Sequence, residues 1–261
     1  MSDKIERLAK ALADAWNNDT TLPLPVLEDA PASRAEAYQI QDRMAQLVGK
    51  RVVGWKVGAT VKAVQQFEGM DGPLPGRIFE DRLFESGATV PAKTVKGLKL
   101  EAEFAFRVTR DIGPGGAPFT REGIADSIVF HPALELAGTR YAPGTGNRGS
   151  RTFDGIADNG SSGAVVIGPA IKDWQKLDFE AMEIACSIDG SPAIQAYGGP
   201  YRRDPATVTA ETLTDLAARG IGFKAGDVLL TGSLTLPTPL RAGQSVTARF
   251  GDLATITVKM V

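Results

Sequence analysis

Two glutamates separated by one residue, Glu101 and Glu103, are the first side chains in this sequence that could do chemistry. They lie in the segment 98–108, where alternate residues form a continuous apolar face and the two glutamates fall on the opposite face. Residues two apart on a strand share a face and lie roughly 6.6 Å apart. Both carboxylates could therefore bind one hard divalent cation such as Mg²⁺, which prefers oxygen ligands. The alternative is the solvated polar face of an antiparallel strand.

A third carboxylate, Glu135, favours the metal interpretation. It lies in the apolar run His-Pro-Ala-Leu-Glu-Leu at 131–136, where an unpaired charge would be costly to bury. A cation shared with the two earlier glutamates would offset that cost. An ion pair with the nearby Arg140 is the competing explanation, and the sequence leaves both open. The single histidine, His131, precedes a proline at the start of this run and is interpreted as structural.

Lys56 is the next candidate, within Gly-Trp-Lys-Val-Gly at 54–58. In a strand, the glycines two residues away on either side share its face, and their small size would let a ligand approach the ammonium group. A partly desolvated lysine can have a pKa lowered toward neutrality and can transfer protons. A lysine whose head group reaches solvent from an edge strand would look the same in the sequence.

Two loops of small polar residues could present hydrogen-bond donors to an anionic ligand. Asp-Asn-Gly-Ser-Ser-Gly at 158–163 precedes an apolar strand, and Thr-Gly-Ser at 231–233 follows another. Such loops at strand ends often bind anions, although they are equally typical of plain turns. A Gly-x-Gly-x-x-Gly pattern at 144–149 has neither a strand before it nor a helix after it, so a dinucleotide site is not predicted.

Composition narrows the chemistry further. The chain has 261 residues, a net charge of −2, one histidine and one cysteine. These counts exclude a disulfide framework and a zinc centre built from several histidines or cysteines, and Cys186 lies on an apolar strand face. The near-neutral charge gives no basic footprint for nucleic acid. Neither a transmembrane segment nor a signal-like apolar segment is apparent, so we expect a cytoplasmic protein without a membrane partner.

The first part of the chain is predicted to be helical. Residues 5–16 carry an apolar stripe at helical spacing. A second helix begins at Ser33, where Glu36 completes a capping box, and ends at Gly49. We therefore expect a small helical N-terminal region over residues 1–75.

From about residue 76 onward short β-like segments dominate, with one late helix that follows the cap Asp204. The regular alternation of strands and helices in a doubly wound sheet is absent. We predict an α+β protein whose β-rich catalytic domain spans 76–261. The expected strands are 52–57, 98–108, 164–167, a hairpin over 181–197 that turns at Asp189-Gly190, 228–231, and a pair within 245–258.

Together these segments resemble the fumarylacetoacetate hydrolase superfamily, in the branch of 2-oxopent-4-enoate hydratases and 4-oxalocrotonate decarboxylases. No single motif is diagnostic, but their order and spacing are specific and cover most of the chain. The segments that carry the resemblance are Gly-Trp-Lys-Val-Gly at 54–58, Leu-Glu-Ala-Glu-Phe-Ala-Phe at 100–106, Pro-Ala-Leu-Glu at 132–135, Ala-Asp-Asn-Gly-Ser-Ser-Gly at 157–163 and Gly-Asp-Val-Leu-Leu-Thr-Gly-Ser at 226–233.

The resemblance implies a fold, a cofactor and a reaction. The fold would be the family's mixed β-roll, assembled as a homo-oligomer, and the cofactor would be Mg²⁺ or Mn²⁺. The substrate would be a small 2-oxo or 2-hydroxydienoate acid, hydrated to a 4-hydroxy-2-oxo acid in aromatic meta-cleavage catabolism. The implied residues are Glu101, Glu103 and Glu135 as metal ligands, Lys56 as the catalytic residue, and Ser161, Ser162, Thr231, Ser233 and Arg140 as substrate-binding residues.

Departures from the family pattern keep other reactions open. Hydratases of this group usually carry an acid in a Pro-Asp-x-Gly segment, where it is proposed to help move protons, and here the matching segment is Pro-Leu-Pro-Gly at 73–76. Leu74 favours a decarboxylase, whereas Thr-Gly-Ser at 231–233 is closer to hydratases than the Thr-Gly-Gly common in decarboxylases. The glycine-rich loop 141–151 is longer than usual, and Gly-Thr-Arg at 138–140 replaces the family's Asp-Ser-Arg.

Three alternatives to the hydratase follow. The first is a 4-oxalocrotonate-type decarboxylase. The second is an acylpyruvate-type carbon–carbon hydrolase. Hydrolases of this kind resemble one another in using a His–Glu pair near an N-terminal lid to activate water. This alternative is disfavoured because the one histidine, His131, lies between the metal-ligand segments. The third is a non-catalytic accessory subunit, which the missing acid at Leu74 keeps open.

Overall fold

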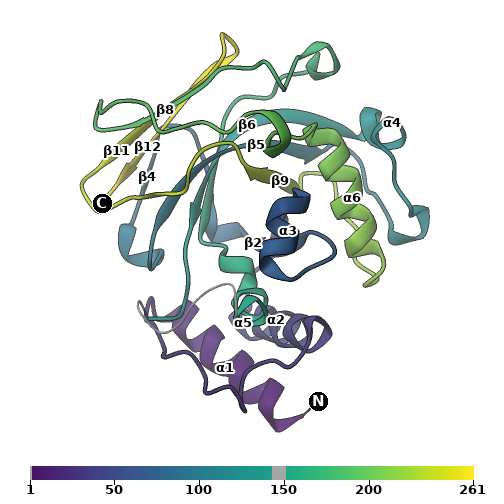
Figure 1. The fold of residues 1–261 in the computed structure, drawn as a ribbon, viewed down its shortest axis with the longest axis vertical. Coiled ribbons are helices and arrows are strands. Elements are labelled where there is room, and N and C mark those ends of the chain that lie inside the picture. The colour runs from purple at the N-terminus through teal and green to yellow at the C-terminus, as the bar shows by residue number, and fades with distance from the viewer. Residues whose placement is uncertain (1, 143–150) are drawn as a thin grey trace.

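Two N-terminal helices, α1 (Asp3–Asn17) and α2 (Arg34–Val48), pack against each other below the sheets in Figure 1. The computed structural model describes residues 2–142 and 151–261. The pattern at 144–149 and most of the glycine-rich loop therefore lie outside the described residues. The buried side of α1 contains the predicted stripe, including Ile5, Leu12 and Trp16. Both helices expected from the sequence are confirmed.

The start and end of α2 follow from local hydrogen bonding. The Glu36 backbone N–H donates to Ser33 Oγ at 3.1 Å, and Glu36 Oε2 in turn accepts from the Ala32 N–H at 2.7 Å. At the other end Gly49 has φ +71° and its N–H donates to the carbonyl of Ala45. A left-handed residue of this kind ends a helix with little strain only when it is glycine.

A mixed sheet of eight strands forms the centre of the molecule. Its strands follow the order β2-β1-β9-β5-β6-β7-β3, and β10 pairs with β5. Most neighbours are antiparallel, whereas β1 runs parallel to β9 and β3 parallel to β7. The strands are β1 (Val52–Gly58), β2 (Leu74–Phe79), β3 (Leu83–Glu85), β5 (Lys99–Val108), β6 (Ile128–Ala137), β7 (Ala164–Ile167), β9 (Val228–Ser233) and β10 (Thr238–Pro239).

The sheet does not follow the boundary that the sequence suggested between residues 75 and 76. β2 spans that point, and it pairs along its length with β1, which comes from the expected N-terminal region. Both strands therefore belong to the β-rich unit. In this part of the chain α1 and α2 come before β1, and a third helix (Lys62–Glu68) lies between β1 and β2.

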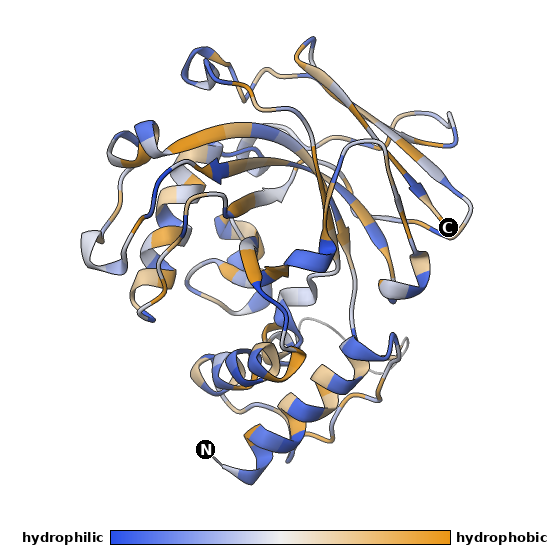
Figure 2. Cartoon of the chain, turned by 180° about the vertical axis from the view of Figure 1, so that it is seen from behind, coloured by the Kyte–Doolittle hydropathy of each residue, from blue (hydrophilic) through white to orange (hydrophobic). Residues whose placement is uncertain are grey.

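A smaller sheet packs over the large one and closes the main core. Its order is β4 (Ala88–Val90), β12 (Ala254–Met260), β11 (Ser245–Phe250) and β8 (Ile184–Ile188). Phe104 and Phe130 of the large sheet meet edge to face with their ring centres 5.5 Å apart, and Phe250 of the small sheet joins the same cluster. Figure 2 shows apolar residues running along the long strands, as burial between two sheets requires.

The expected hairpin over 181–197 is only half formed. Asp189 and Gly190 have φ +52° and +69°, as a tight two-residue turn requires. However, β8 pairs along its length with β11, and the returning segment forms an isolated bridge between Ala196 and Thr235 in place of a strand. The pair of strands expected within 245–258, β11 and β12, is confirmed.

Short helices cover the remaining side of the large sheet. α6 (Pro205–Ala217) begins as predicted, with Asp204 Oδ1 accepting from the Thr207 N–H at 2.7 Å. The others are α3 (Lys62–Glu68), α4 (Arg121–Ile124) and α5 (Thr152–Ala157), and none of these three was predicted. Among the described residues, no helix is long and apolar enough to cross a membrane.

Candidate active site

The antiparallel pairing of β5 with β6 brings the three glutamates together. Glu101 lies directly opposite Glu135, and Glu103 lies two residues further along the same face of β5. One carboxylate oxygen from each residue lies within 4.8 Å of the other two. These three side chains are called the acid cluster below. The sheet register, which joins residues far apart in sequence, is what adds the third acid to the first two.

Burial makes the acid cluster electrostatically unfavourable on its own. Glu103 and Glu135 are 1% and 0% exposed, whereas Glu101 is partly exposed. Burial, followed by repulsion from Glu135 and Glu101, raises the pKa of Glu103 well above its usual value, although the Gly232 N–H donates to Oε2 of Glu103 at 2.9 Å. Crowded like charges disfavour ionisation, so a stable ionised cluster requires a compensating cation.

Lys56 supplies part of that compensation. It comes from β1, it is almost fully buried, and its Nζ lies 3.1 Å from Oε1 of Glu135. Burial on its own would lower the pKa of Lys56, but attraction by Glu135, Glu101 and Glu103 outweighs burial and raises the pKa. The lowered pKa suggested by the sequence is therefore not found, because the ammonium group faces three carboxylates.

The residues of the acid cluster fit a hard divalent cation. Within residues 2–142 and 151–261, no aligned hydrogen-bond donor reaches either oxygen of Glu135, although both are buried. Three carboxylates thus face a single ammonium group. Carboxylate oxygens are the ligands that Mg²⁺ and Mn²⁺ prefer, and Glu101 places the cluster at the wall of a cavity from which an ion can enter.

The resemblance implied that Arg140 binds the substrate, but its contacts in the structure are with other residues of the protein. Its guanidinium forms an ion pair with Asp158 and donates to the backbone carbonyls of Asp158 and Ser162. It also stacks over Trp16, 5.0 Å from a ring centre. Arg140 is 6% exposed and does not line the cavity. The competing explanation for Glu135 therefore also fails, because Arg140 pairs with Asp158 and Glu135 pairs with Lys56.

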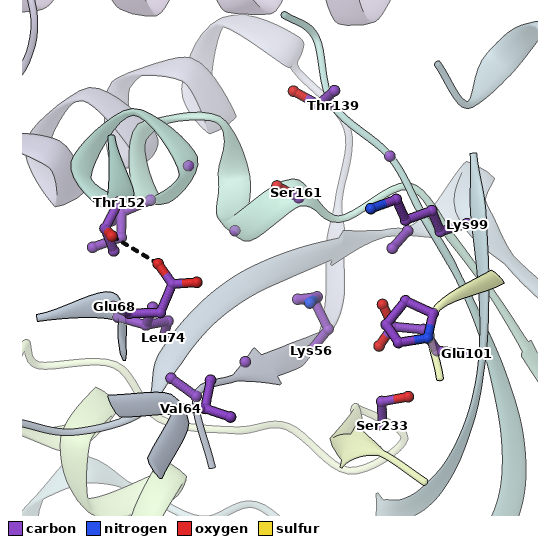
Figure 3. Close-up of a pocket in the computed structure, with 18 of the residues that line it drawn as sticks. Lys56, Val64, Glu68, Leu74, Lys99, Glu101, Thr139, Thr152, Ser161 and Ser233 are labelled. Atoms are coloured by element: carbon purple, nitrogen blue, oxygen red, sulfur yellow. Dashed lines mark hydrogen bonds between the residues drawn. The ribbon is translucent and has the colours of Figure 1, made fainter. Parts of the chain in front are cut away.

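The four hydroxyl residues expected to bind substrate divide into two pairs. Ser161 and Ser233 line the cavity, and Figure 3 shows them on opposite sides of Lys56. Ser162 and Thr231 do not line it: Ser162 is 2% exposed, and Thr231 Oγ1 donates to the carbonyl of Phe104 at 3.0 Å. Only Ser161 and Ser233 are therefore placed to contact a ligand in this cavity.

The cavity has a volume of about 650 Å³ and two ends of different construction. The strand end, defined by Lys56, Glu101 and Ser233, comes from β1, β5 and β9 (Figure 3). The helix end consists of residues from α3, α5 and the start of β2. Figure 3 shows Lys56 between Glu101 and the residues of the helix end. The helix end is defined by Val64, Glu68, Leu74 and Thr152.

The sequence analysis did not anticipate the polar pair at the helix end. Thr152 Oγ1 donates to Glu68 Oε2 at 2.7 Å, and both residues line the cavity. Glu68 is the last residue of α3, which ends at Gly69 in the left-handed conformation. The good helix formers at 62–68 and the glycine that follows are a usable helix signal, but seven residues are too few to show an apolar stripe.

A close backbone contact ties the helix end to the turn that carries Ser161. A Cβ atom at Gly76 would lie only 2.1 Å from the carbonyl oxygen of Asn159. The Asn159 side chain accepts from the Arg77 N–H at 2.7 Å and donates to the Arg77 carbonyl at 2.9 Å. Glycine is thus required at position 76, and the start of β2 is held against the turn 159–161.

An acid cluster with a buried lysine at the wall of a cavity is typical of an enzyme active site. The profile of the family described as "Fumarylacetoacetate (FAA) hydrolase C-terminal" matches residues 79–261, and the chain belongs to this family. The resemblance stated from the sequence is confirmed, and so is the predicted α+β fold with small N-terminal helices and a curled mixed sheet.

Relatives extend the match over most of the chain. A 2-hydroxyhexa-2,4-dienoate hydratase of Comamonas testosteroni is 35% identical over 93% of both chains. A 2-keto-4-pentenoate hydratase of Paraburkholderia xenovorans is 31% identical over 88% of this chain and 84% of its own length. With hydratases matched over this length, the chain is an enzyme of the lyase class.

A solved structure shows the same fold at lower identity. The 4-oxalocrotonate decarboxylase from Pseudomonas putida G7, complexed with magnesium and adipate, superposes with a TM-score of 0.87. The match covers 100% of this chain and 99% of the decarboxylase at 22% identity. The helical pair and both sheets are thus shared by the two proteins.

Proposed function

We propose that this protein hydrates a small 2-hydroxydienoate, such as 2-hydroxypenta-2,4-dienoate, to a 4-hydroxy-2-oxo acid in the catabolism of aromatic compounds. The observation that carries the proposal is the acid cluster beside Lys56 at the wall of the cavity. Two relatives named as hydratases of such acids, matched over most of the chain, support this substrate class.

The proposal assigns Mg²⁺ or Mn²⁺ to Glu101, Glu103 and Glu135. A divalent ion bound there stabilises the negative charge that develops on the C2 oxygen of the substrate. The magnesium and adipate in the decarboxylase of the same fold support a divalent ion and a small acid in this kind of site.

The chain's own residues then have separate tasks. Without a cation the raised pKa keeps Lys56 protonated. A divalent ion bound by the three carboxylates would weaken their attraction for the ammonium group, so that Lys56 could accept the proton of the C2 hydroxyl group as the enol becomes a ketone. Ser161 and Ser233 line the cavity and bind the substrate carboxylate. The Ser233 hydroxyl group, which donates to the Thr235 carbonyl at 2.7 Å, would have to turn toward the substrate to do so. Water then adds to C4 of the conjugated ketone, where it supplies a hydroxyl group, and its remaining proton goes to C3.

Decarboxylation of a 2-oxo-3-enedioate is the second candidate, because of one specific observation. Leu74 lines the helix end of the cavity, so the 73–76 segment places an apolar side chain where hydratases of this group usually have an acid. The structure gives less support to the carbon–carbon hydrolase, which would need a histidine at the cavity. His131 is buried, does not line the cavity, and has its Nδ1 2.8 Å from the carbonyl of Gly168.

One assay separates these reactions. Purified protein is given 2-hydroxypenta-2,4-dienoate or 2-oxohex-3-enedioate, with Mg²⁺ or with a chelator. The proposal predicts Mg²⁺-dependent loss of the dienoate absorbance without release of CO₂. Release of CO₂ from the enedioate as the main reaction would instead establish the decarboxylase, and no turnover of either acid would favour the accessory subunit.

We also propose that the enzyme acts as a cytoplasmic homo-oligomer. The family resemblance supports the oligomer, and the mass of the particle in solution tests it. A particle of 27.6 kDa, the mass of one chain, would contradict it.

A further inference from the structure

We propose that Glu68 is a catalytic residue: it carries the proton to and from the tail carbon of the substrate, at the helix end of the cavity. It would supply there the carboxyl group that the Pro-Leu-Pro-Gly segment at 73–76 lacks. This inference rests on the proposed hydration and concerns its second proton, which Lys56 at the strand end does not deliver.

The contacts of Glu68 support this assignment. Glu68 and Leu74 both line the helix end, so a carboxyl group is present in the same part of the cavity as the leucine (Figure 3). The hydrogen bond from Thr152 Oγ1 at 2.7 Å holds one oxygen of Glu68 and fixes the side chain between α3 and α5. A carboxyl group positioned in this way can exchange protons with a ligand.

The other acidic side chains that line the cavity already have partners in the structure. Among the described lining residues the carboxylates are Glu68, Glu101 and Asp154. Glu101 belongs to the acid cluster. Asp154 is 3% exposed and paired with Arg151. Glu68 is partly exposed in the cavity, and its one described side-chain donor is an uncharged hydroxyl group.

The proton balance of the hydration requires such a group. When the C2 enol becomes a ketone, the O–H bond at C2 breaks and its electrons form the C2=O bond. The C2=C3 electrons move to C3=C4, and the C4=C5 electrons form a new C–H bond at C5. Glu68 gives a proton to C5, and the proton that leaves the C2 hydroxyl group returns through water to the Glu68 carboxylate. No oxidant or reductant is needed.

The two ends of the cavity match these two proton transfers, one at C2 and one at C5. The carboxylate and C2 oxygen of the substrate belong at the strand end, next to the acid cluster and Lys56. The conjugated chain then extends toward Val64, Leu74 and Glu68. Two proton carriers at opposite ends of one conjugated system can move protons at C2 and C5 without a side chain that crosses the cavity.

The test is the Glu68→Gln variant with 2-hydroxypenta-2,4-dienoate in D₂O, followed by NMR. We expect kcat and the rate of deuterium incorporation at C5 to fall by about 100-fold, the lower end for a lost general acid. KM should stay within about threefold, because glutamine keeps the size and the hydrogen bond from Thr152. Affinity for Mg²⁺, which Glu68 does not bind, should be unchanged.

Two further variants separate a proton carrier from a structural residue. Leu74→Asp added to Glu68→Gln restores an acid at the neighbouring wall position and should recover at least about tenfold of the lost rate. Thr152→Val removes the donor but keeps the Glu68 carboxyl, and should lower kcat severalfold. Glu122→Gln, on an exposed carboxylate of α4, is the matched control and should behave like the wild type.

Each outcome decides between two ideas. Wild-type protein that does not consume the dienoate overturns the proposed function, and this inference with it. Wild-type turnover that Glu68→Gln preserves within twofold overturns only the assignment of Glu68. A Glu68→Gln variant that loses activity together with its thermal stability is replaced by Glu68→Asp and Thr152→Val, and full activity in both would also overturn the assignment.

Discussion

The two ends of the cavity differ in how they are built. The strand end stands on β5 and β6, which pair residue by residue over ten positions and bury Glu103 and Glu135 almost completely. The helix end stands on α3 and α5, helices of seven and six residues whose cavity-lining side chains Val64, Glu68 and Thr152 are partly exposed. One end is fixed by a long ladder of hydrogen bonds and the other by short local elements.

This difference separates cation binding from recognition of the substrate tail, although each end carries one proton-transfer residue. Functional groups on long paired strands are held more exactly than groups on loops and short helices. The strand end is therefore suited to cation binding and enolate stabilisation, where small displacements are costly. The helix end is suited to the tail of the substrate, where relatives acting on different acids must differ.

The largest effect is expected at the strand end, in Lys56→Met. We expect kcat to fall by about 10³-fold, within the range for a lost proton-transfer group. Affinity for Mg²⁺ should not fall, because the substitution removes a positive charge that lies 3.1 Å from Glu135. Calorimetric titration with Mg²⁺, alongside kinetics, measures both. A parallel loss of cation affinity would mean that Lys56 organises the acid cluster and does not move protons.

The next prediction separates two acids of the cluster. Glu103→Gln should weaken Mg²⁺ binding by at least about 100-fold, because a lost ligand costs no less than the loss of a residue that only supports a ligand. In chelator, however, the substitution should raise the melting temperature. The pKa of Glu103 is raised by burial and by its acidic neighbours, so neutral glutamine relieves repulsion in the metal-free protein. Differential scanning calorimetry tests this: compared with the wild type, the variant should melt at a higher temperature in chelator and should gain less stability from added Mg²⁺.

Glu135→Gln is the matched comparison. It removes the partner of Lys56 and leaves a buried ammonium group without its nearest carboxylate, and breaking such a pair costs about 3–5 kcal/mol. The metal-free melting temperature should therefore fall in Glu135→Gln and rise in Glu103→Gln. Equal shifts in the two variants would show that the cluster responds as a single charged group.

A smaller and more selective effect is expected at the helix end. Val64→Phe narrows the part of the cavity reserved for the substrate tail. KM should rise about tenfold for dienoates with longer alkyl tails, the discrimination expected from a methylene group, and stay unchanged for the five-carbon acid. Steady-state kinetics on a series of tail lengths checks this. An equal rise in KM for every tail length would contradict the proposed difference in function between the two ends.

The last effect is expected away from both ends, at Cys186, and only at alkaline pH. Its side chain is fully buried on β8, and burial raises the pKa of the thiol to about 11 from a usual value near 9. The folded protein then holds a proton that the unfolded chain loses, so stability decreases as pH rises from about 9 to 11, by on the order of 2 kcal/mol. Urea unfolding at several pH values should show that Cys186→Ala removes this part of the pH dependence, and a persisting slope would assign it to other groups.

The sequence predicted the parts of the molecule that local patterns determine. The two N-terminal helices have caps and stripes within one segment, and the period of two at 98–108 already placed Glu101 and Glu103 on one face. Partners that lie far away in the chain could not be predicted with the same certainty. For Glu135 the sequence offered a shared cation or an ion pair with Arg140. The folded arrangement, in which β1 lies beside β9, instead brings Lys56 within 3.1 Å of Glu135.

The errors have the same physical origin. The backbone groups at the edges of β8 can pair with any suitable strand. β8 pairs along its length with β11, whereas the segment after its own turn returns to it through the hydrogen bond from the Ile194 N–H to the Cys186 carbonyl. The resemblance implied substrate binding by Arg140, and the contacts of its guanidinium group with Asp158 and Trp16, which place it away from the cavity wall, could not be predicted from the sequence. Glu68 was missed because α3 is too short to be recognised from periodicity, and its place in the cavity depends on contacts with α5.

The close approach of Gly76 to Asn159 has a consequence for how new substrate preferences could arise. Gly76, at the end of the 74–76 segment, is in close contact with the turn that carries Ser161. A substitution in this segment would therefore shift Ser161, which is proposed to bind the substrate carboxylate, as well as the wall around the substrate tail. Val61 and Val64 border the same cavity from α3 and its cap, outside this contact. We expect laboratory evolution toward longer or branched acids to accumulate changes at these valines first, and to alter 74–76 only after a compensating change near residue 159.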